Sequence, residues 1–337
     1  MSGIILPFFG LFVIKLHDGD YYRFFGEAGK IARITIPFVS LSLLGSFGVV
    51  PRCITVAHGG ISYMLEDISL FSFAVLFSVV TFFLCLKEQL MMKALGKWMS
   101  PVLLVILIIL IGIGVAKSGN PIPKVNANKA FVNGFLVGYQ TMDLLAAFFF
   151  SSLIFKQMKH LVPKNTSNKQ TIIFAIKSSL IGSTLLMTIY FGFVYLGSHY
   201  GSLLVDVPTE FMLSTIVHNV IDKWAAAVLS IVMFLSCLTT AVALNNIYAR
   251  YIFSLLKLNE KQFPVVLALA ILVSFTISLL NFKAIAGFLA PILDITYPGL
   301  IFLTIISICT RNYAKSKTYL FWSITFCSFV YYIISHF

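Results

Sequence analysis

Ten stretches of this chain are apolar and long enough, or nearly so, to cross a membrane as helices. They lie near residues 1–16, 34–58, 68–86, 100–116, 130–155, 172–198, 224–249, 264–280, 285–309 and 319–336. A spanning helix needs about 20 mostly apolar residues because the hydrocarbon core of a bilayer is about 30 Å thick. The predicted fold class is therefore all-α, a polytopic membrane protein with about ten transmembrane helices.

The composition agrees with this prediction. Hydrophobic residues make up 59% of the 337 residues and charged residues only 11%, whereas soluble domains are about 25% charged. The net charge of +12 does not indicate a nucleic-acid partner, because the basic residues are scattered over the connecting loops. The expected environment is membrane lipid, with multi-pass insertion in a bacterial inner membrane.

Lysine and arginine residues are distributed unequally between the two sides of this topology. With ten spans, 18 of the 24 lie on one side and 6 on the other, and the richer side is expected to be cytoplasmic. Both Met1 and Phe337 then fall outside the cell. We expect one further helix before Met1 and one after Phe337 to complete the usual arrangement.

The sequence lacks the common patterns of an enzyme. It contains no Walker loop, no GxSxG, no HExxH and no CxxC pair. A lipid-modifying membrane enzyme would need His, Asp or Ser side chains clustered near one interface, and no such cluster is found. The chain is therefore predicted not to be an enzyme and to need no cofactor. No metal is expected beyond a coupling Na⁺.

A carboxylate stands in the middle of the apolar stretch 130–155. Asp143 follows the polar, glycine-containing run Gly138, Tyr139, Gln140 and Thr141. An ionisable group at mid-membrane costs about 2.5–3.5 kcal/mol, and such groups usually mark a pathway. We predict that the helix is broken here, so that freed backbone N–H and C=O groups bind the α-carboxylate and α-amino group of a substrate. Asp143 either holds this segment in shape or faces the cation or the amino group.

A second interpretation of the same stretch remains open. Gly134 and Gly138 form a GxxxG pattern, which is typical of close packing between two membrane helices.

Two other spans carry polar residues that suit a coupling ion. In 224–249, the hydroxyls of Ser236, Thr239 and Thr240 share one helical face and are predicted to bind a cation, although such hydroxyls also bond back to their own helix. In 285–309, Asp294 is a possible proton site. Prolines are expected to bend two spans, Pro51 in 34–58 and the pair Pro291 and Pro298 around Asp294.

At these residues the chain resembles the bacterial branched-chain amino acid system II carriers, the LIVCS family of cation symporters. The stretch GFLVGYQTMDLLAA matches a GYLTMDALA-type motif, and GSFGVVPRCITVA matches a GPLFALPRTATV-type motif. CLTTAVAL and ITYPG match CLVTAVGL-type and IYPP-type motifs. The matches occur in order and cover most of the chain.

The resemblance implies a LeuT-type fold with two inverted repeats, in a single domain over 1–337. Residues 1–129 would be the remainder of the first repeat, 130–309 the second repeat, and 310–337 an extra helix. It implies that Gly138–Asp143 is the unwound part of the sixth helix and that Thr240 carries the sodium-site hydroxyl. Thr239 matches an apolar family position.

The implied function is secondary active import of leucine, isoleucine, valine or methionine, coupled to Na⁺ or H⁺. Nothing in the chain matches the family's first helix, a GAGNxIFPP-type segment, and the twelfth helix is also unmatched. Asp294 stands where an uncharged residue is expected. Either the natural start lies upstream, or the protein is a non-transporting remnant or a binding-only homologue.

Overall fold

The structure is a computed structural model that describes residues 2–62, 64–65, 68–86, 100–119, 126–161, 168–310 and 314–336. Within these ranges every regular element is a helix and no strand occurs. The predicted all-α class is confirmed for this part of the chain.

Seven helical segments of the described residues are long and apolar enough to cross a membrane. They are Ala32–Ile61, Ala127–Phe155, Lys177–His199, Trp224–Leu255, Glu260–Ser278, Phe282–Cys309 and Ser316–Ser335. Three shorter apolar helices, Gly3–Leu16, Leu70–Leu86 and Pro101–Ala116, coincide with the other three predicted stretches. The protein is a multi-pass membrane protein; the count of ten spans and the LeuT-type arrangement stay predictions.

The chain divides into two compact units, each of which is described by itself. The first comprises Met1–Ser40, Val125–Met187 and Phe288–Phe337, and the second comprises Leu41–Lys124 and Thr188–Gly287. The division into two repeats and a final helix is not tested by this grouping.

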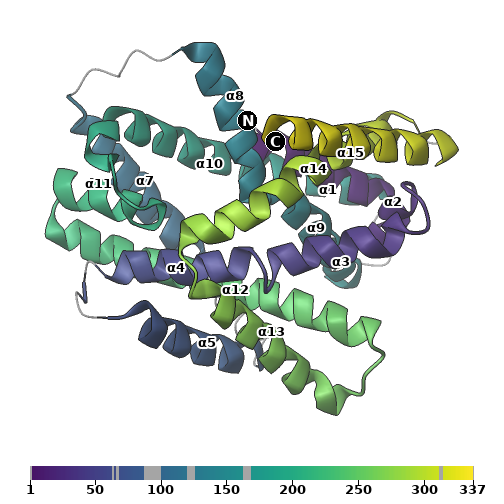
Figure 1. Cartoon of the computed structure of the whole chain (residues 1–337), viewed down its shortest axis with the longest axis horizontal. Coiled ribbons are helices and arrows are strands. Elements are labelled where there is room, and N and C mark those ends of the chain that lie inside the picture. The colour runs from purple at the N-terminus through teal and green to yellow at the C-terminus, as the bar shows by residue number, and fades with distance from the viewer. Residues whose placement is uncertain are drawn as a thin grey trace. The chain divides into compact units, whose positions relative to one another are not determined.

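The first unit contains several complete helices and parts of three others (Figure 1). They are α1 (Ser2–Leu16), α2 (Tyr21–Gly26), α8 (Ala127–Val137), the 3₁₀ helix η2 (Gly138–Thr141), α9 (Asp143–Leu161) and α15 (Ala314–His336), with parts of α3 (Ala32–Leu44), α10 (Asn168–His199) and α14 (Phe282–Cys309).

The second unit holds the remaining helices and the other parts of α3, α10 and α14. Its complete elements are α4 (Val49–Ile61), α5 (Leu70–Leu86), α7 (Ser100–Ala116), η3 (Gly201–Leu204), η4 (Thr209–Phe211), α11 (Met212–Val220), α12 (Lys223–Leu255), η5 (Glu260–Gln262) and α13 (Phe263–Ser278).

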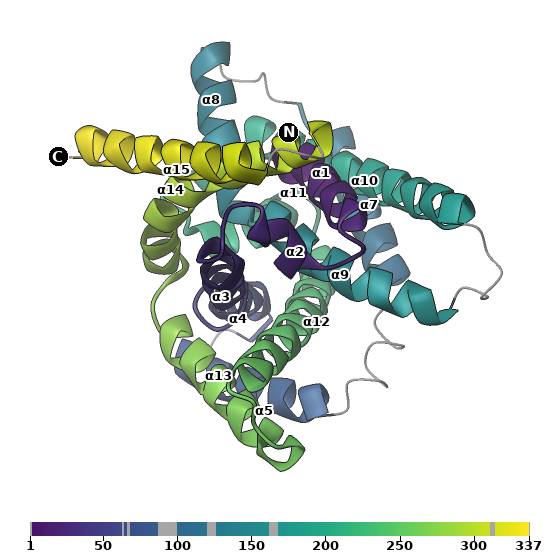
Figure 2. The ribbon, with the colours of Figure 1, turned by 90° about the vertical axis from the view of Figure 1, so that its right-hand side faces the viewer.

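In the first unit α1 packs along α9 (Figure 2). The approach is close at Gly10, where an added Cβ would lie 3.1 Å from Leu144 Cδ1. Phe24 and Phe25 of α2 and Phe148 of α9 are fully buried, with ring centroids 4.9–5.4 Å apart. This aromatic contact fixes α9, which carries the candidate site at its N-terminal end.

A partly buried ion cluster also stabilises the first unit. The Glu27 carboxylate accepts hydrogen bonds at 2.9 Å from the ammonium of Lys317, whose side chain is 1% exposed. It also accepts a hydrogen bond from the Ser307 hydroxyl. His17 Nε2 lies 3.2 Å from Glu27 Oε1, and His17 Nδ1 lies 2.8 Å from the carbonyl oxygen of Val13. Both imidazole nitrogens face acceptors, which favours the protonated ring.

The pKa values of the cluster shift in opposite directions. Burial alone would raise the pKa of Glu27, but hydrogen bonds from His17, Ser307 and Lys317 lower it from 4.5 to about 2. Burial alone would lower the pKa of His17, but its hydrogen bonds to Glu27 and Val13 raise it above 6.5. The Glu27 contribution to stability is complete above 4.5 and is lost as the pH falls toward 2. The His17 contribution is complete below 6.5 and is lost as the pH rises through its raised pKa.

We therefore expect the thermal midpoint of the purified protein to be highest between pH 4.5 and 6.5, the window that these two shifts define. Glu27→Gln should lower the midpoint by several degrees in this window and flatten the profile, because it removes the charge that both cations face. The measurement is thermal unfolding in detergent from acidic to alkaline pH. Glu260→Gln, at an exposed glutamate of η5, is the matched control, and a profile of Glu27→Gln that coincides with the wild type would contradict the assignment.

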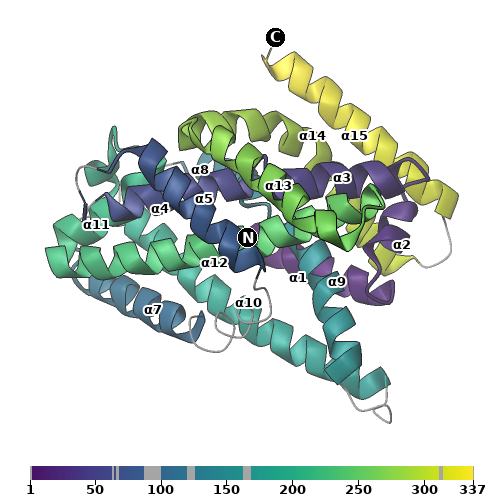
Figure 3. The ribbon, with the colours of Figure 1, turned by 90° about the horizontal axis from the view of Figure 1, so that it is seen from below.

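In the second unit, α12 is the central helix and packs against α4, α5 and α13 (Figure 3). Buried polar groups join these helices. The Ser230 hydroxyl donates to the carbonyl of Gly60 at 2.6 Å, and the Asn246 side chain donates to the carbonyl of Cys85 at 3.5 Å. Inside a membrane such bonds hold helices together without a hydrophobic driving force between them.

The predicted bend at Pro51 is replaced by a true interruption a few residues earlier. Helix α3 ends at Leu44 and α4 begins at Val49. Between them the N–H groups of Phe47 and Val50 bond five residues back, to Ser42 and Gly45. Pro51 lies in the first turn of α4, where a missing N–H costs little. The wide turns at Gly45–Gly48, not the proline, break the span.

Candidate functional site

The predicted break in the span 130–155 is present. Helix α8 ends at Val137, residues Gly138–Thr141 form the 3₁₀ helix η2, and α9 begins at Asp143. Between η2 and α9, Met142 adopts a left-handed conformation with φ 57° and ψ 19°. A residue with positive φ cannot continue a right-handed helix, so α8 and α9 are two half-helices that meet inside one apolar segment.

The local hydrogen bonds show which backbone groups the break frees. The N–H of Met142 bonds to the carbonyl of Tyr139 at 3.1 Å, and the Thr141 hydroxyl donates to the carbonyl of Gly138 at 2.8 Å. The N–H of Ala146 bonds to the carbonyl of Met142. Helix geometry leaves the first N–H groups of α9 without partners inside the helix. These groups carry partial positive charge and suit a carboxylate.

The alternative interpretation of a GxxxG packing face has no contact to support it at Gly134 among the described residues. A Cβ added to Gly134 would meet no atom of the described residues within 4 Å. Helix α8 has no buried residue, and Val132, Leu136 and Val137 are each about half exposed. In the described part of the chain, the glycine is thus not explained by a close helix contact.

Two tyrosines and two aspartates gather beside the break. The ring of Tyr139 lies 4.9 Å from the ring of Tyr297 on α14, with 32° between their planes. Asp143 is close enough to the Tyr297 hydroxyl to interact electrostatically, and Asp294 interacts in the same way with Tyr139. Both aspartates are half-buried. The first unit therefore places the possible proton site Asp294 near the predicted substrate segment.

The remaining residues of the predicted substrate segment are more open. Gly138 and Gln140 are half-buried, and Thr141 is exposed. Tyr297 was not singled out from the sequence beyond its place in ITYPG. A tyrosine directly before a proline, inside an apolar span and three residues after an aspartate, was the available signal.

Proline also affects the backbone at Asp294. Because Pro298 has no N–H, it cannot donate the usual helical hydrogen bond to the carbonyl of Asp294, four residues earlier. Helix α14 nevertheless continues from Phe282 to Cys309 with both prolines inside it. Asp294 thus has two acceptor groups near Tyr139: its carboxylate, and a backbone carbonyl that receives no hydrogen bond from Pro298.

The three hydroxyls predicted to bind a cation lie in the second unit and bond back to their own helix. The hydroxyls of Thr239 and Thr240 both donate to the carbonyl of Ser236, at 2.7 and 2.9 Å. Ser236 is exposed, and Thr239 and Thr240 are half-buried. Each hydroxyl oxygen keeps lone pairs that a hard cation can use, so the geometry is compatible with both interpretations of this face.

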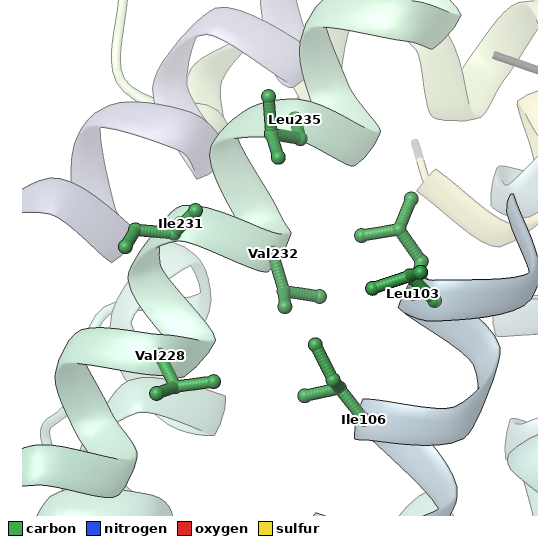
Figure 4. Close-up of a pocket in the computed structure, with 7 residues that line it drawn as sticks. Leu103, Ile106, Val228, Ile231, Val232 and Leu235 are labelled. Carbon is green, nitrogen blue, oxygen red and sulfur yellow. The ribbon is translucent and has the colours of Figure 1, made fainter. Parts of the chain in front are cut away.

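A cavity of about 300 Å³ lies between α7 and α12 (Figure 4). Its lining consists only of aliphatic side chains: Val102, Leu103, Ile106, Val228, Ile231, Val232 and Leu235. Such a lining offers no hydrogen bond or charge to a carboxylate or an ammonium group, and burying these groups without partners is costly. This cavity does not suit a zwitterion.

A multi-pass helical membrane protein with a span interrupted at polar backbone has the architecture of a membrane transport protein. The family model for branched-chain amino acid transport proteins matches residues 1–337. The chain belongs to this family, and it is a transporter rather than an enzyme.

Curated relatives agree with the family. A Staphylococcus aureus (strain bovine RF122 / ET3-1) protein, whose name describes a branched-chain amino acid carrier, is 28% identical over 324 residues, covering 88% of this chain and 70% of that protein. A Staphylococcus haemolyticus (strain JCSC1435) protein with the same description is 25% identical over 340 residues, covering 92% and 73%. No solved structure matches the chain.

Proposed function

We propose that this protein imports branched-chain amino acids by secondary active transport coupled to Na⁺ or H⁺. The observation that carries the proposal is the break between η2 and α9, where Met142 turns left-handed inside an apolar span. The N–H groups of the first turn of α9 are suited to hold the substrate carboxylate. The carbonyls and polar side chains from Gly138 to Asp143 are suited to hold its ammonium group.

The membership of the family supports the substrate class. Branched-chain amino acids differ from one another by single methyl or methylene groups, and one such group discriminates by only about 1–3 kcal/mol. Leucine, isoleucine and valine are therefore expected to share the site, and methionine to compete with them.

The coupling ion has two candidate positions. The hydroxyl face of Ser236, Thr239 and Thr240 supplies hard oxygen donors that suit Na⁺. The half-buried carboxylate of Asp294 is suited to exchange a proton, since an ionisable group within a span commonly belongs to a proton pathway. We propose the hydroxyl face as the Na⁺ site and Asp294 as the alternative H⁺ site.

The test is uptake of labelled isoleucine by liposomes that contain the purified protein, under a Na⁺ gradient and, separately, under a pH gradient. If Na⁺ is the coupling ion, Thr240→Val should lower Na⁺-driven uptake about tenfold, equivalent to about 1.4 kcal/mol, because it removes an oxygen ligand at constant shape. Thr240→Ser, which keeps the hydroxyl, is the matched control. If only the pH gradient drives uptake, Asp294→Asn should abolish it. Absence of isoleucine uptake under both gradients would refute the proposed function.

A further inference from the structure

The phenol of Tyr297 is buried beside the break and its hydroxyl is unsatisfied. Tyr297 is 1% exposed, and its Oη makes no hydrogen bond among the residues that the structure describes. Buried hydroxyls nearly always have a partner, because removal from water without one is costly. An exception at this position needs an explanation.

The hydroxyl is directed at the N-terminal turn of α9. It lies near the backbone N–H groups of Leu144 and Leu145 and near the carboxylate of Asp143, without the geometry of a hydrogen bond. The N–H groups are donors and can meet only the lone pairs of the phenol. In the described part of the chain the O–H proton of Tyr297 therefore has no acceptor, and it stands beside the positive end of a helix of 19 residues.

The position of the ring is fixed by its neighbours. Tyr139 packs on it at 4.9 Å between centroids, and Pro298, the next residue on α14, restricts the backbone of Tyr297. A fixed ring keeps the O–H close to the first turn of α9, so little conformational freedom is lost when an acceptor arrives.

The backbone N–H groups and the phenol together form a convergent set of donors. A ligand that satisfies all of them needs at least two acceptor oxygens and a negative charge, as a carboxylate has. We propose that Tyr297 is a specificity-determining residue, whose O–H donates to the α-carboxylate held at the N-terminal turn of α9. This inference rests on the proposed function and adds a side-chain ligand to its substrate site. The carboxylate reaches the buried phenol when the covering side chains separate, as alternating access requires.

The experiment compares a ligand with and without a carboxylate. Competition with labelled isoleucine uptake is measured for isoleucine and for isoleucinamide, in the wild type and in Tyr297→Phe. We expect Tyr297→Phe to weaken isoleucine about tenfold and to change isoleucinamide less than about twofold, because the amide lacks the anionic acceptor. Tyr251→Phe, at another buried tyrosine, on α12 in the second unit, is the matched control and should change neither.

The outcomes separate the two proposals. In one outcome the wild type takes up isoleucine, and Tyr297→Phe weakens isoleucine and isoleucinamide equally or weakens neither. This result overturns the role of Tyr297 and leaves the proposed function intact. Absence of wild-type isoleucine uptake refutes the proposed function and, with it, this inference.

A second substitution keeps the test valid if Tyr297→Phe does not fold. A fluorinated tyrosine introduced at position 297 preserves the ring and the hydroxyl but makes the O–H more acidic. Because the neutral O–H is then a stronger hydrogen-bond donor, isoleucine affinity at neutral pH should rise about twofold or more, while isoleucinamide affinity should change less. An isoleucine affinity identical to that of the wild type would overturn the proposal.

Discussion

Asp143→Asn is expected to lower isoleucine uptake about tenfold or more, equivalent to at least about 1.4 kcal/mol. Asp143 is the first residue of α9 and the acid of its first turn. Its negative charge lies at the positive end of the helix dipole and interacts favourably with it. The asparagine of the variant keeps the shape of the side chain but removes that charge. Uptake by proteoliposomes measures the effect. Asp206→Asn, at an exposed aspartate with positive φ that asparagine tolerates, is the matched control.

The same variant separates the two roles left open for Asp143. If the carboxylate holds the break in shape, Asp143→Asn should lower the maximal rate and the thermal midpoint. If it faces the substrate amino group or the cation, the variant should raise the KM for isoleucine or for the ion and leave the midpoint unchanged. Wild-type uptake by Asp143→Asn would refute both roles.

Gly59→Ala is expected to destabilise the fold of the second unit strongly. A Cβ at Gly59 of α4 would lie 2.7 Å from the backbone carbonyl oxygen of Glu210 in η4. A backbone carbonyl cannot rotate away as a side chain can, so α4 and η4 must separate. Overpacking of this kind costs about 1–3 kcal/mol and occasionally more. Loss of monodisperse protein in size-exclusion chromatography and a lowered thermal midpoint are the readouts.

Gly197→Ala is the matched control for this prediction. Gly197 is also inside a helix, α10, but a Cβ there meets no described atom within 4 Å. Alanine is favoured over glycine in a helix interior by about 1 kcal/mol, so this variant should be neutral or slightly stabilising. Equal midpoints for Gly59→Ala and the wild type would show that η4 moves away from α4 without cost.

Local features of the sequence predicted the membrane class and the position of the broken helix. Apolar runs of spanning length are visible one segment at a time, and so is a polar, glycine-containing run such as Gly138–Thr141 inside one of them. The sequence did not show that Met142 is the residue that turns left-handed. It also placed the irregularity of the span 34–58 at Pro51, whereas the structure breaks it at Gly45–Gly48.

Contacts between distant segments could not be predicted in this way. Glu27 and Lys317 form a partly buried ion pair although they are 290 residues apart in the chain. From the sequence, each is an ordinary charged residue near the end of an apolar segment. The hydroxyls of Ser236, Thr239 and Thr240 are the opposite case. Helical spacing was enough to predict that they share one face, whereas cation binding by that face remains a proposal.

The sequence by itself determined that this chain crosses a membrane several times as helices, and it predicted the interruption beside Asp143 that the structure shows. Hydropathy, glycine and buried charge act within a single segment, so their order along the chain suffices. Only the tertiary structure brought the phenol of Tyr297 to the first turn of α9 and left its O–H without an acceptor among the described residues. Which donors converge on one point depends on how α9 and α14 pack, and packing joins residues that no local pattern connects.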